Sequence, residues 1–301
     1  MKKICLILLV ICLLFATACE QPTEEPEPTI DPHEGEIQVS DGNGGLMWVP
    51  EAENLTPFAP EAELFSVTDG DVGYSGDGWT LRRGIDVSSY QGDIDWQAVA
   101  DSGVSFAIIR CAWRGYTSGT LNVDDRFHQN IEGALAAGLD VGIYIYSQAI
   151  NVYEAAEEAI FTVDLIRDYE VSLPVFFDWE LPSGTDVRTE NVDGTTLTDC
   201  CLEFCRLIES AGYTPGVYTY INLAYFKYEL NRLDGLTIWM ANPGSQPTFY
   251  YDYTYWQYSF TGNVPGIEGE TDLDVMFIPL KTEPAAEPLP SEISTTDGET
   301  P

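Results

Sequence analysis

Strand and helix signals alternate along residues 81–280, and this alternation constrains the fold more than any other feature of the chain. Short apolar segments are separated by segments with helical spacing, such as Phe127, Ile131 and Leu135 before Gly138. Such alternation favours a mainly parallel sheet with helices packed on it. Eight strands in about 200 residues predict a closed α/β barrel, and this length suits one domain. The missing helix between the last two strands predicts an irregular barrel.

The expected elements follow from these signals. Strands are predicted near residues 84–87, 106–111, 141–146, 174–180, 216–219, 236–240, 254–258 and 274–277. Helices are predicted near residues 94–102, 125–137, 151–169, 196–210 and 223–230.

The fourth expected strand, Pro174–Glu180, ends in two carboxylates one residue apart. Strand side chains alternate between faces, so Asp178 and Glu180 point the same way and Trp179 points the other way. Their Cα atoms should be roughly 6.6 Å apart, close enough for each charge to oppose ionisation of the other. Such a pair supplies one acid and one carboxylate, as glycoside hydrolysis requires. An acidic strand end that faces solvent is the alternative.

Further carboxylates stand near other strand ends. Asp86 lies in the first strand, and Asp272 and Asp274 lie at the last. In a barrel such ends converge on one mouth, where active sites of barrel enzymes lie. Aromatic side chains accompany the acids and suit the apolar faces of sugar rings, although about half of them should belong to the core. The candidates for substrate contact are Tyr116, Tyr144, Tyr146, Tyr218, Trp239 and Trp256.

Taken together and in order, several stretches resemble the Chalaropsis-type lysozymes, glycoside hydrolase family 25. The matching segments are Gly84-Ile85-Asp86-Val87-Ser88, Tyr90-Gln91-Gly92, Ile94-Asp95-Trp96, Phe177-Asp178-Trp179-Glu180, Gly216-Val217-Tyr218, Trp239-Met240-Ala241, Trp256-Gln257-Tyr258, Val264-Pro265-Gly266-Ile267 and Asp272-Leu273-Asp274. The resemblance implies a single catalytic domain with an irregular TIM-like (β/α)5β3 barrel. It also implies an N-acetylmuramidase without a cofactor, which cuts the β-1,4 bond between N-acetylmuramic acid and N-acetylglucosamine in peptidoglycan.

The resemblance also implies roles for individual residues. Glu180 matches the general acid and Asp178 the second carboxylate, while Asp86 and Asp272 match acids of the first and last strands. Asp178 would either attack the anomeric carbon or steady the 2-acetamido group of the substrate as that group attacks, and the N-acetylated substrate favours the second route.

Two positions depart from the pattern of the family. Asp274 stands where the family usually has Asn, and Tyr146-Ser147 replaces an aromatic-His pair on the third strand. If Asp274 faces the cleft, its charge should raise the pKa of Glu180. The alternative places Asp274 deeper in the barrel wall or at a bulge, bonded to a backbone N–H and away from the cleft.

The ends of the chain predict export. Residues 1–18 combine basic Lys2 and Lys3 with a short apolar run and resemble a signal peptide, too short to span a membrane. The following Cys19 resembles a bacterial lipobox cysteine, which implies a lipid anchor at the outer face of the membrane; a plain secretory signal is the alternative. Residues 19–80 are acidic, rich in Pro and Gly, and read as a tether whose part 46–64 could dock on the domain. Residues 281–301 read as a disordered tail.

Charge and cysteine content exclude other classes. A net charge of −36 argues against nucleic acid and against anionic surfaces as electrostatic partners. Neither His33 nor His128 has metal-ligand spacing to a cysteine, so no metal site is predicted. The cysteines of the domain, Cys111, Cys200, Cys201 and Cys205, read as buried free thiols. The expected protein is a monomer. A glycan-binding module without turnover is the main alternative, and a phosphodiesterase would need metal ligands or basic contacts.

We predict that Cys19→Ala moves the protein from the membrane fraction to the medium, because each buried lipid methylene contributes about 0.8 kcal/mol to membrane binding. Fractionation followed by immunoblotting measures this shift. The matched control is Cys12→Ala, which changes a cysteine inside the expected signal peptide and should leave the distribution unaltered. Wild-type protein found wholly in the medium with an unmodified N-terminus would contradict the lipid anchor.

Overall fold

The computed structural model describes residues 31–41, 43–68, 70–181 and 187–280. The predicted signal peptide, Cys19 and the predicted tail from 281 to 301 lie outside the described residues. The described residues from Gly35 onward form one compact unit, to which the following description applies.

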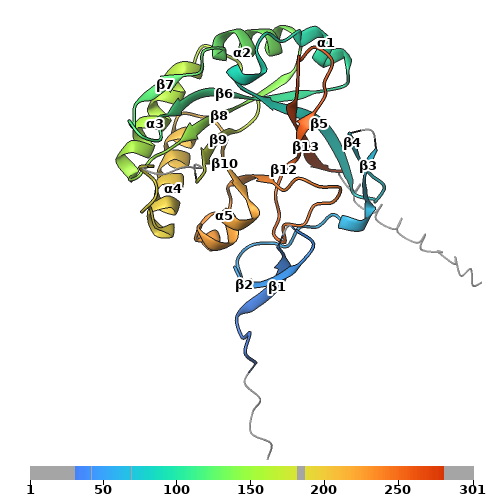
Figure 1. Cartoon of the computed structure of the whole chain (residues 1–301), viewed down its shortest axis with the longest axis vertical. Helices are drawn as coiled ribbons and strands as arrows, with labels where there is room; N and C mark the ends of the chain where they lie inside the picture. Colours follow the sequence, from blue (N-terminus) through green and yellow to red (C-terminus); the bar gives the residue numbers. More distant parts are fainter. Residues whose placement is uncertain (1–30, 42, 69, 182–186, 281–301) are drawn as a thin grey trace, which may run out of the picture. The chain divides into compact units, whose positions relative to one another are not determined.

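Eight strands of this unit form a closed barrel (Figure 1). The ring closes because the first strand pairs with both the second and the last. Every neighbouring pair is parallel except the two that involve the last strand, which runs antiparallel to both of its neighbours. In ring order the strands are β5 (Trp79–Val87), β6 (Phe106–Arg114), β8 (Asp140–Ser147), β9 (Val175–Trp179), β10 (Pro215–Tyr220), β11 (Thr237–Ala241), β12 (Tyr255–Gly262) and β13 (Thr271–Pro279). The predicted eight-stranded α/β barrel is confirmed.

One α-helix follows each of the first five barrel strands, and no α-helix separates the last three within the described residues. The helices are α1 (Trp96–Asp101), α2 (Phe127–Ala136), α3 (Val152–Ile166), α4 (Gly194–Ser210) and α5 (Ile221–Phe226). The Asn151 side chain caps α3 by accepting hydrogen bonds from the N–H groups of Tyr153 and Glu154. The short strand β7 (Leu121–Val123) pairs with β6, and 3-10 turns lie at η1 (Ala62–Leu64), η2 (Ser89–Gln91) and η3 (Leu230–Arg232).

Alternation along the strands separates two apolar clusters. Phe176 of β9 belongs to a small, aromatic-rich cluster with residues from other barrel strands, whereas Phe177 and Trp179 belong to the large cluster shared with the helices. Phe177 packs on Phe204 of α4 with ring centroids 5.3 Å apart. A glycine is required at position 84, because a Cβ there would lie 2.1 Å from the ring of Phe106. Asp178 shares the parity of Phe176 and therefore faces the barrel interior.

Strands begin earlier in the chain than the sequence predicted. Two antiparallel hairpins precede the barrel, namely β1 (Glu36–Ser40) with β2 (Leu46–Pro50), and β3 (Phe65–Thr68) with β4 (Asp71–Tyr74). The prediction of a tether as far as residue 80 is therefore wrong for this part. Acidic, Gly-rich composition concealed short strands that each bury apolar side chains, which are Val39, Val49, Phe65 and Val72.

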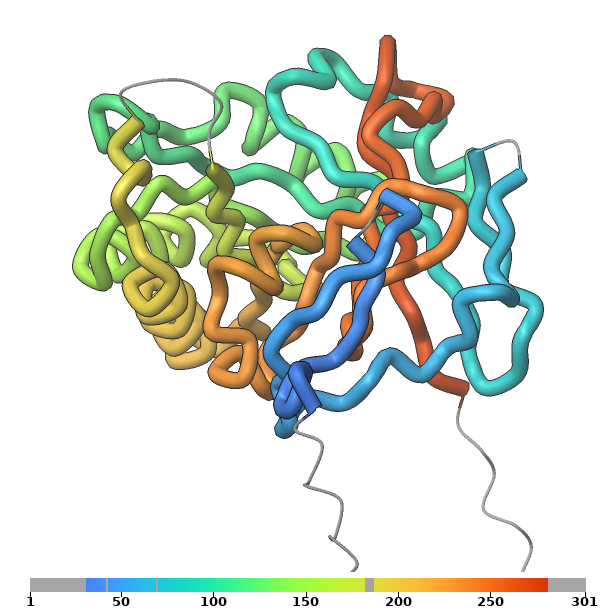
Figure 2. Tube along the Cα trace, turned by 60° about the horizontal axis from the view of Figure 1, so that its bottom comes forward, coloured from blue at the N-terminus to red at the C-terminus, as the bar shows by residue number. Residues whose placement is uncertain are grey.

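The expected docking of residues 46–64 takes place against the connection between β11 and β12. Phe58 stacks on Tyr253 with ring centroids 4.5 Å apart, and Pro57 forms a β-bridge with Tyr251. The Tyr251 hydroxyl also accepts a hydrogen bond of 2.7 Å from the N–H of Ala52. Figure 2 shows these segments, distant in sequence, side by side. Residues 52–58 are thus part of the domain.

The four cysteines of the domain, Cys111, Cys200, Cys201 and Cys205, are buried and form no disulfide, as predicted. Among the described residues, no cluster of three or more His, Cys, Asp or Glu side chains is arranged to hold a metal ion. No helix in the described ranges is both long and apolar enough to cross a membrane.

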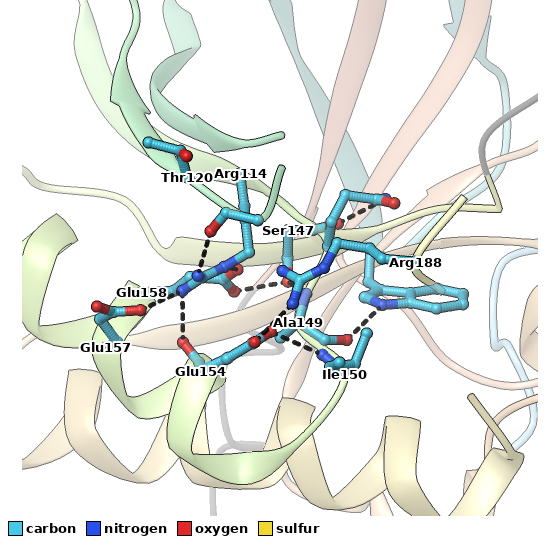
Figure 3. A network of polar contacts seen from close by, with 12 residues as sticks. Arg114, Thr120, Ser147, Ala149, Ile150, Glu154, Glu157, Glu158 and Arg188 are labelled. Atoms are coloured by element: carbon cyan, nitrogen blue, oxygen red, sulfur yellow. Dashed lines mark hydrogen bonds and ion pairs between the residues drawn. The ribbon is translucent and has the colours of Figure 1, made fainter. Parts of the chain in front are cut away.

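A buried polar network joins β6, β8 and α3 (Figure 3). Arg114 donates hydrogen bonds to Glu158 at 2.6 Å and to Glu157 at 2.8 Å. The Ser147 hydroxyl donates to the other oxygen of Glu158 at 2.6 Å. Burial raises the pKa of Glu158 to about 7, although Ser147 and Arg114 lower it. Ser147, one of the two departures from the family pattern, thus contributes to this network.

Glu157 and Glu158 provide a matched test of this network, since both contact Arg114 but their side chains are 62% and 0% exposed. We predict that Glu158→Ala lowers the free energy of unfolding by about 3 kcal/mol or more, because the nearly buried guanidinium loses its buried partner. Glu157→Ala should cost less than about 1 kcal/mol, as exposed ion pairs do. Urea unfolding measures both values. Equal losses in the two variants would contradict the assignment.

Candidate active site

Four carboxyl groups meet at one mouth of the barrel. Asp86 lies at the end of β5, Asp178 lies near the end of β9, and Glu180 follows that strand directly. Asp272 lies at the start of β13, opposite Asp86 in register. Because β13 runs against its neighbours, its first residues reach the mouth where the other strands end. All four side chains line one cavity of about 230 Å³.

Asp178 and Glu180 form a hydrogen-bonded pair. Burial raises the pKa of Asp178 well above its usual range, and the charge of Glu180 raises it further. Burial also raises the pKa of Glu180, whereas its hydrogen bond with Asp178 lowers it. The sequence predicted repulsion from neighbouring carboxylates as the cause for Glu180, but burial is the larger cause. The pair titrates as a unit and holds a proton at a pH where an ordinary carboxyl is ionised.

Hydrogen bonds to the connection between β8 and α3 fix the backbone at Glu180. The side chain of Gln148 donates a hydrogen bond of 3.0 Å to the Glu180 carbonyl, and Thr189 donates one of 3.2 Å to Gln148. The Trp179 indole N–H donates to the Ala149 carbonyl at 3.0 Å, on the outer side of the strand. The backbone around the pair is therefore fixed to the connection between β8 and α3.

Asp86 is held by neutral donors. The Gln257 amide donates a hydrogen bond of 2.6 Å to Asp86 Oδ2, and the Tyr218 hydroxyl donates one of 2.9 Å to Gln257 Oε1. Burial, followed by the charges of Asp274 and Asp272, raises the pKa of Asp86 well above its usual range. Burial also raises the pKa of Asp272 to about 6, and the charge of Glu180 adds to this rise.

Asp274 lies beneath the cleft and is not among the residues that line it. Its Oδ1 accepts a hydrogen bond of 2.8 Å from the Trp239 indole N–H. Burial raises the pKa of Asp274 to about 8. The expectation that Asp274 faces the cleft and raises the pKa of Glu180 is wrong, because its charge acts on Asp86. The alternative was right about depth, although the partner is an indole and not a backbone N–H.

The predicted aromatic residues separate into three groups. Tyr144, Tyr146, Tyr218 and Trp239 line the cavity with the acids. Tyr116 is 51% exposed and lines an adjoining cavity of about 700 Å³.

Trp256, by contrast, is fully buried in the main core, and its indole N–H donates a hydrogen bond of 2.8 Å to the Asn242 carbonyl. The prediction of substrate contact is therefore wrong for Trp256. Strand parity explains the error, since the next residue, Gln257, is the one that points into the cleft.

Arg110 is a cleft residue that the sequence reasoning missed. It lines both the cavity with the acids and the adjoining one. Its guanidinium pairs with Asp124 at 2.7 Å and lies over the Tyr90 ring, 5.0 Å from the centroid. Its charge lowers the pKa of Asp178. The signal was available, because an arginine inside an apolar strand is seldom buried without a partner or a function.

The fold and the site together define the class of this protein. It is a closed α/β barrel with an acidic cleft at its mouth, and the cleft holds a buried pair of carboxyl groups. Residues 85–267 match the family described as Glycosyl hydrolases family 25. The chain belongs to this family, as its resemblance predicted.

The relatives of this chain include curated lysozymes. The autolytic lysozyme of Clostridium acetobutylicum is 32% identical over 195 residues, which cover 64% of this chain and 55% of that protein. The chain thus spans about half the length of that relative. Lysozyme M1 of Streptomyces globisporus is 29% identical over 265 residues, covering 76% of this chain and 87% of that one. The crystal structure of a bacterial lysozyme from Streptomyces coelicolor matches with a TM-score of 0.54 and 26% identity, over 64% of this chain and 90% of that one.

The raised pKa of Asp274 has a consequence for stability. Because the folded state keeps this proton up to about pH 8, its contribution to the free energy of unfolding is complete at low pH. That contribution is lost as pH rises through the window between the ordinary and the raised pKa. Asp274→Asn keeps an oxygen for Trp239 and removes the titration. We predict that, relative to this variant, the wild type loses stability between about pH 4 and pH 8.

Urea unfolding of both proteins at several pH values measures the difference. A free-energy difference that stays constant between pH 4 and pH 8 would contradict the raised pKa. Ser66→Ala, a change on the exposed face of β3, serves as the control and should follow the wild type.

Proposed function

We propose that this chain is a peptidoglycan hydrolase, a lysozyme of the N-acetylmuramidase type that cleaves the β-1,4 bond between N-acetylmuramic acid and N-acetylglucosamine. The observation that carries the proposal is the buried, hydrogen-bonded pair of Asp178 and Glu180 at the mouth of the barrel. The names of the curated relatives, autolytic lysozyme and Lysozyme M1, support the same substrate. Five strand–helix units followed by three strands support the (β/α)5β3 description of the barrel.

Glu180 acts as the general acid. It is the less buried member of the pair and lines the cavity, so the shared proton can reach a glycosidic oxygen bound there. Donation of this proton to the leaving oxygen breaks the bond without expelling an alkoxide. The raised pKa values of the pair favour the protonated form that donation requires.

Asp178 assists the attack on the anomeric carbon by the acetamido group of the substrate. It is 4% exposed, and its buried Oδ1 has no hydrogen-bond partner among the described residues. An acetamido N–H of the substrate would satisfy this oxygen and orient the acetamido carbonyl toward the anomeric carbon. This feature supports the substrate-assisted route over direct attack by Asp178.

Asp86 and Asp272 orient the substrate beside the pair. Both line the cavity, and Gln257 fixes Asp86 through its hydrogen bond of 2.6 Å. Tyr144, Tyr218 and Trp239 supply aromatic surface for the sugar ring. A glycan-binding module without turnover would have no need of a buried acid pair with raised pKa values, so this alternative is not favoured.

We also propose that the protein acts as a monomer at the outer face of the membrane, exported by its N-terminal signal and anchored through lipid on Cys19. The lipobox-like sequence before Cys19 supports this location. An anchor would keep the hydrolase beside the glycan strands of the wall.

We predict that Glu180→Gln retains the fold and lowers the rate of peptidoglycan cleavage by at least about a hundredfold, because general-acid transfer contributes about 10² to 10⁴. Release of reducing ends from purified peptidoglycan, with mass analysis of the products, measures the rate and identifies the bond. The control is Glu170→Gln, a change of the same kind at an exposed position outside the cavity with the acids. Near-full activity of a folded Glu180→Gln protein would refute the assignment.

A further inference from the structure

The β1–β2 hairpin reaches the cleft. A cavity of about 410 Å³ is lined by Asp41 and Asn43 of the hairpin together with Glu180 and Tyr218. Glu180 and Tyr218 also line the cavity that holds the other acids, so the two spaces adjoin at the acid pair. The hairpin precedes residues 85–267, the segment that matches the family. A part of the chain outside the family match thus contributes to the cleft.

The hairpin has a defined structure. Val39 and Val49 are 3% and 1% exposed and belong to the main core. At the turn, Asp41 Oδ1 accepts hydrogen bonds from the N–H groups of Asn43 and Gly45, both at 2.8 Å. The Asp41 N–H donates to the Gly45 carbonyl at 3.1 Å. These contacts hold the described turn residues at the rim of the cavity.

The lining of this cavity suits a neutral sugar. Asn43 and Asn222 present exposed side-chain amides, which can both donate to and accept from hydroxyl groups. Phe260 is 50% exposed and Tyr220 is half-buried, and such rings pack against the apolar face of a sugar. Among the described lining residues there is no lysine or arginine, and Asp41 adds a negative charge. An anionic group would be disfavoured here.

The two cavities beside the acids lie over different arcs of the barrel. The cavity with Arg110 and Tyr116 is lined from β6, β8 and the segment that follows β5. Besides the hairpin, the hairpin cavity is lined from β10, β11, β12, the start of α5 and the residue after β9. Glu180 lines the hairpin cavity but not the cavity with Arg110 and Tyr116. Since the general acid must reach the leaving oxygen, the hairpin side is the side of the leaving group.

We propose that the β1–β2 hairpin, together with Asn222 and Phe260, forms the binding site for the N-acetylglucosamine unit that leaves when the glycan is cut. This inference rests on the proposed function. It assigns to an N-terminal segment outside the family match the binding of the neutral sugar on the far side of the cleaved bond.

The test is Asn43→Trp, which adds bulk on the hairpin side of the cavity and changes none of the acids. Two substrates are compared: peptide-free glycan strands, and a synthetic N-acetylmuramic acid glycoside in which a small phenol replaces the leaving sugar. For the glycan strands kcat/KM should fall about tenfold or more, which corresponds to about 1.4 kcal/mol of lost binding. The loss with the phenyl glycoside should be several-fold smaller, because the phenol does not extend to the hairpin.

A matched control places the same bulk on the other hairpin. Thr68→Trp changes an exposed residue at the end of β3, outside the lining of the cleft, and should leave both substrates unaffected. Thermal unfolding checks that both variants fold. Phe260→Ala tests the opposite wall and should also lower kcat/KM preferentially for the glycan strands.

The outcomes separate the two proposals. The role of the hairpin is overturned if the wild type cleaves the glycan but Asn43→Trp lowers kcat/KM equally for both substrates, or for neither. That result would leave the proposed hydrolase activity intact. Failure of the wild type to cleave either substrate would refute the hydrolase itself.

Discussion

The burial of carboxyl groups at the mouth of the barrel is the constraint on which the rest of the site depends. An ionised carboxylate loses several kcal/mol on leaving water unless it is paired. Among the described residues that line the acid cavity, Arg110 is the only cation, and it already pairs with Asp124 at 2.7 Å. Neutral donors hold these buried carboxyl groups, since Gln257 donates to Asp86 and Trp239 donates to Asp274 beneath the cavity. Burial therefore raises the pKa values of these groups, and no unpaired cation in the cavity offsets it.

The reversal of β13 makes this concentration of acids compatible with a closed barrel. In an all-parallel ring, a carboxylate at the start of a strand would lie at the opposite mouth from those at strand ends. Because β13 is antiparallel to β5, Asp272 pairs in register with Asp86, and Asp274 pairs with Gly84 one layer below. The lower layer then affects the upper one, because the charge of Asp274 raises the pKa of Asp86. Trp239 in turn donates a hydrogen bond to one oxygen of Asp274.

Features that depend on neighbouring residues could be predicted from the sequence, and features that depend on distant contacts could not. Strand alternation correctly predicted that Asp178 and Glu180 lie on one side and Trp179 on the other, and the alternation of strands with helices predicted the barrel. Trp256 was misassigned because composition alone does not give the parity of an irregular strand, and β12 carries a bulge after Gln257. The two N-terminal hairpins were missed because their order comes from a few buried side chains, such as Val49 and Phe65, that contact residues far along the chain.

The residues proposed to catalyse the reaction and the residues proposed to bind the leaving sugar lie in different parts of the chain. The acids stand on strands whose positions are fixed by hydrogen-bonded pairing with both neighbours, which suits groups that must keep a proton between them. The rim is built from connections and from the β1–β2 hairpin, which adheres to the barrel mainly through buried valines. Changes at a turn such as Asn43 leave strand pairing intact, whereas changes in β9 displace the acid pair. A hairpin that precedes the barrel can therefore alter what the cleft binds without altering how it reacts.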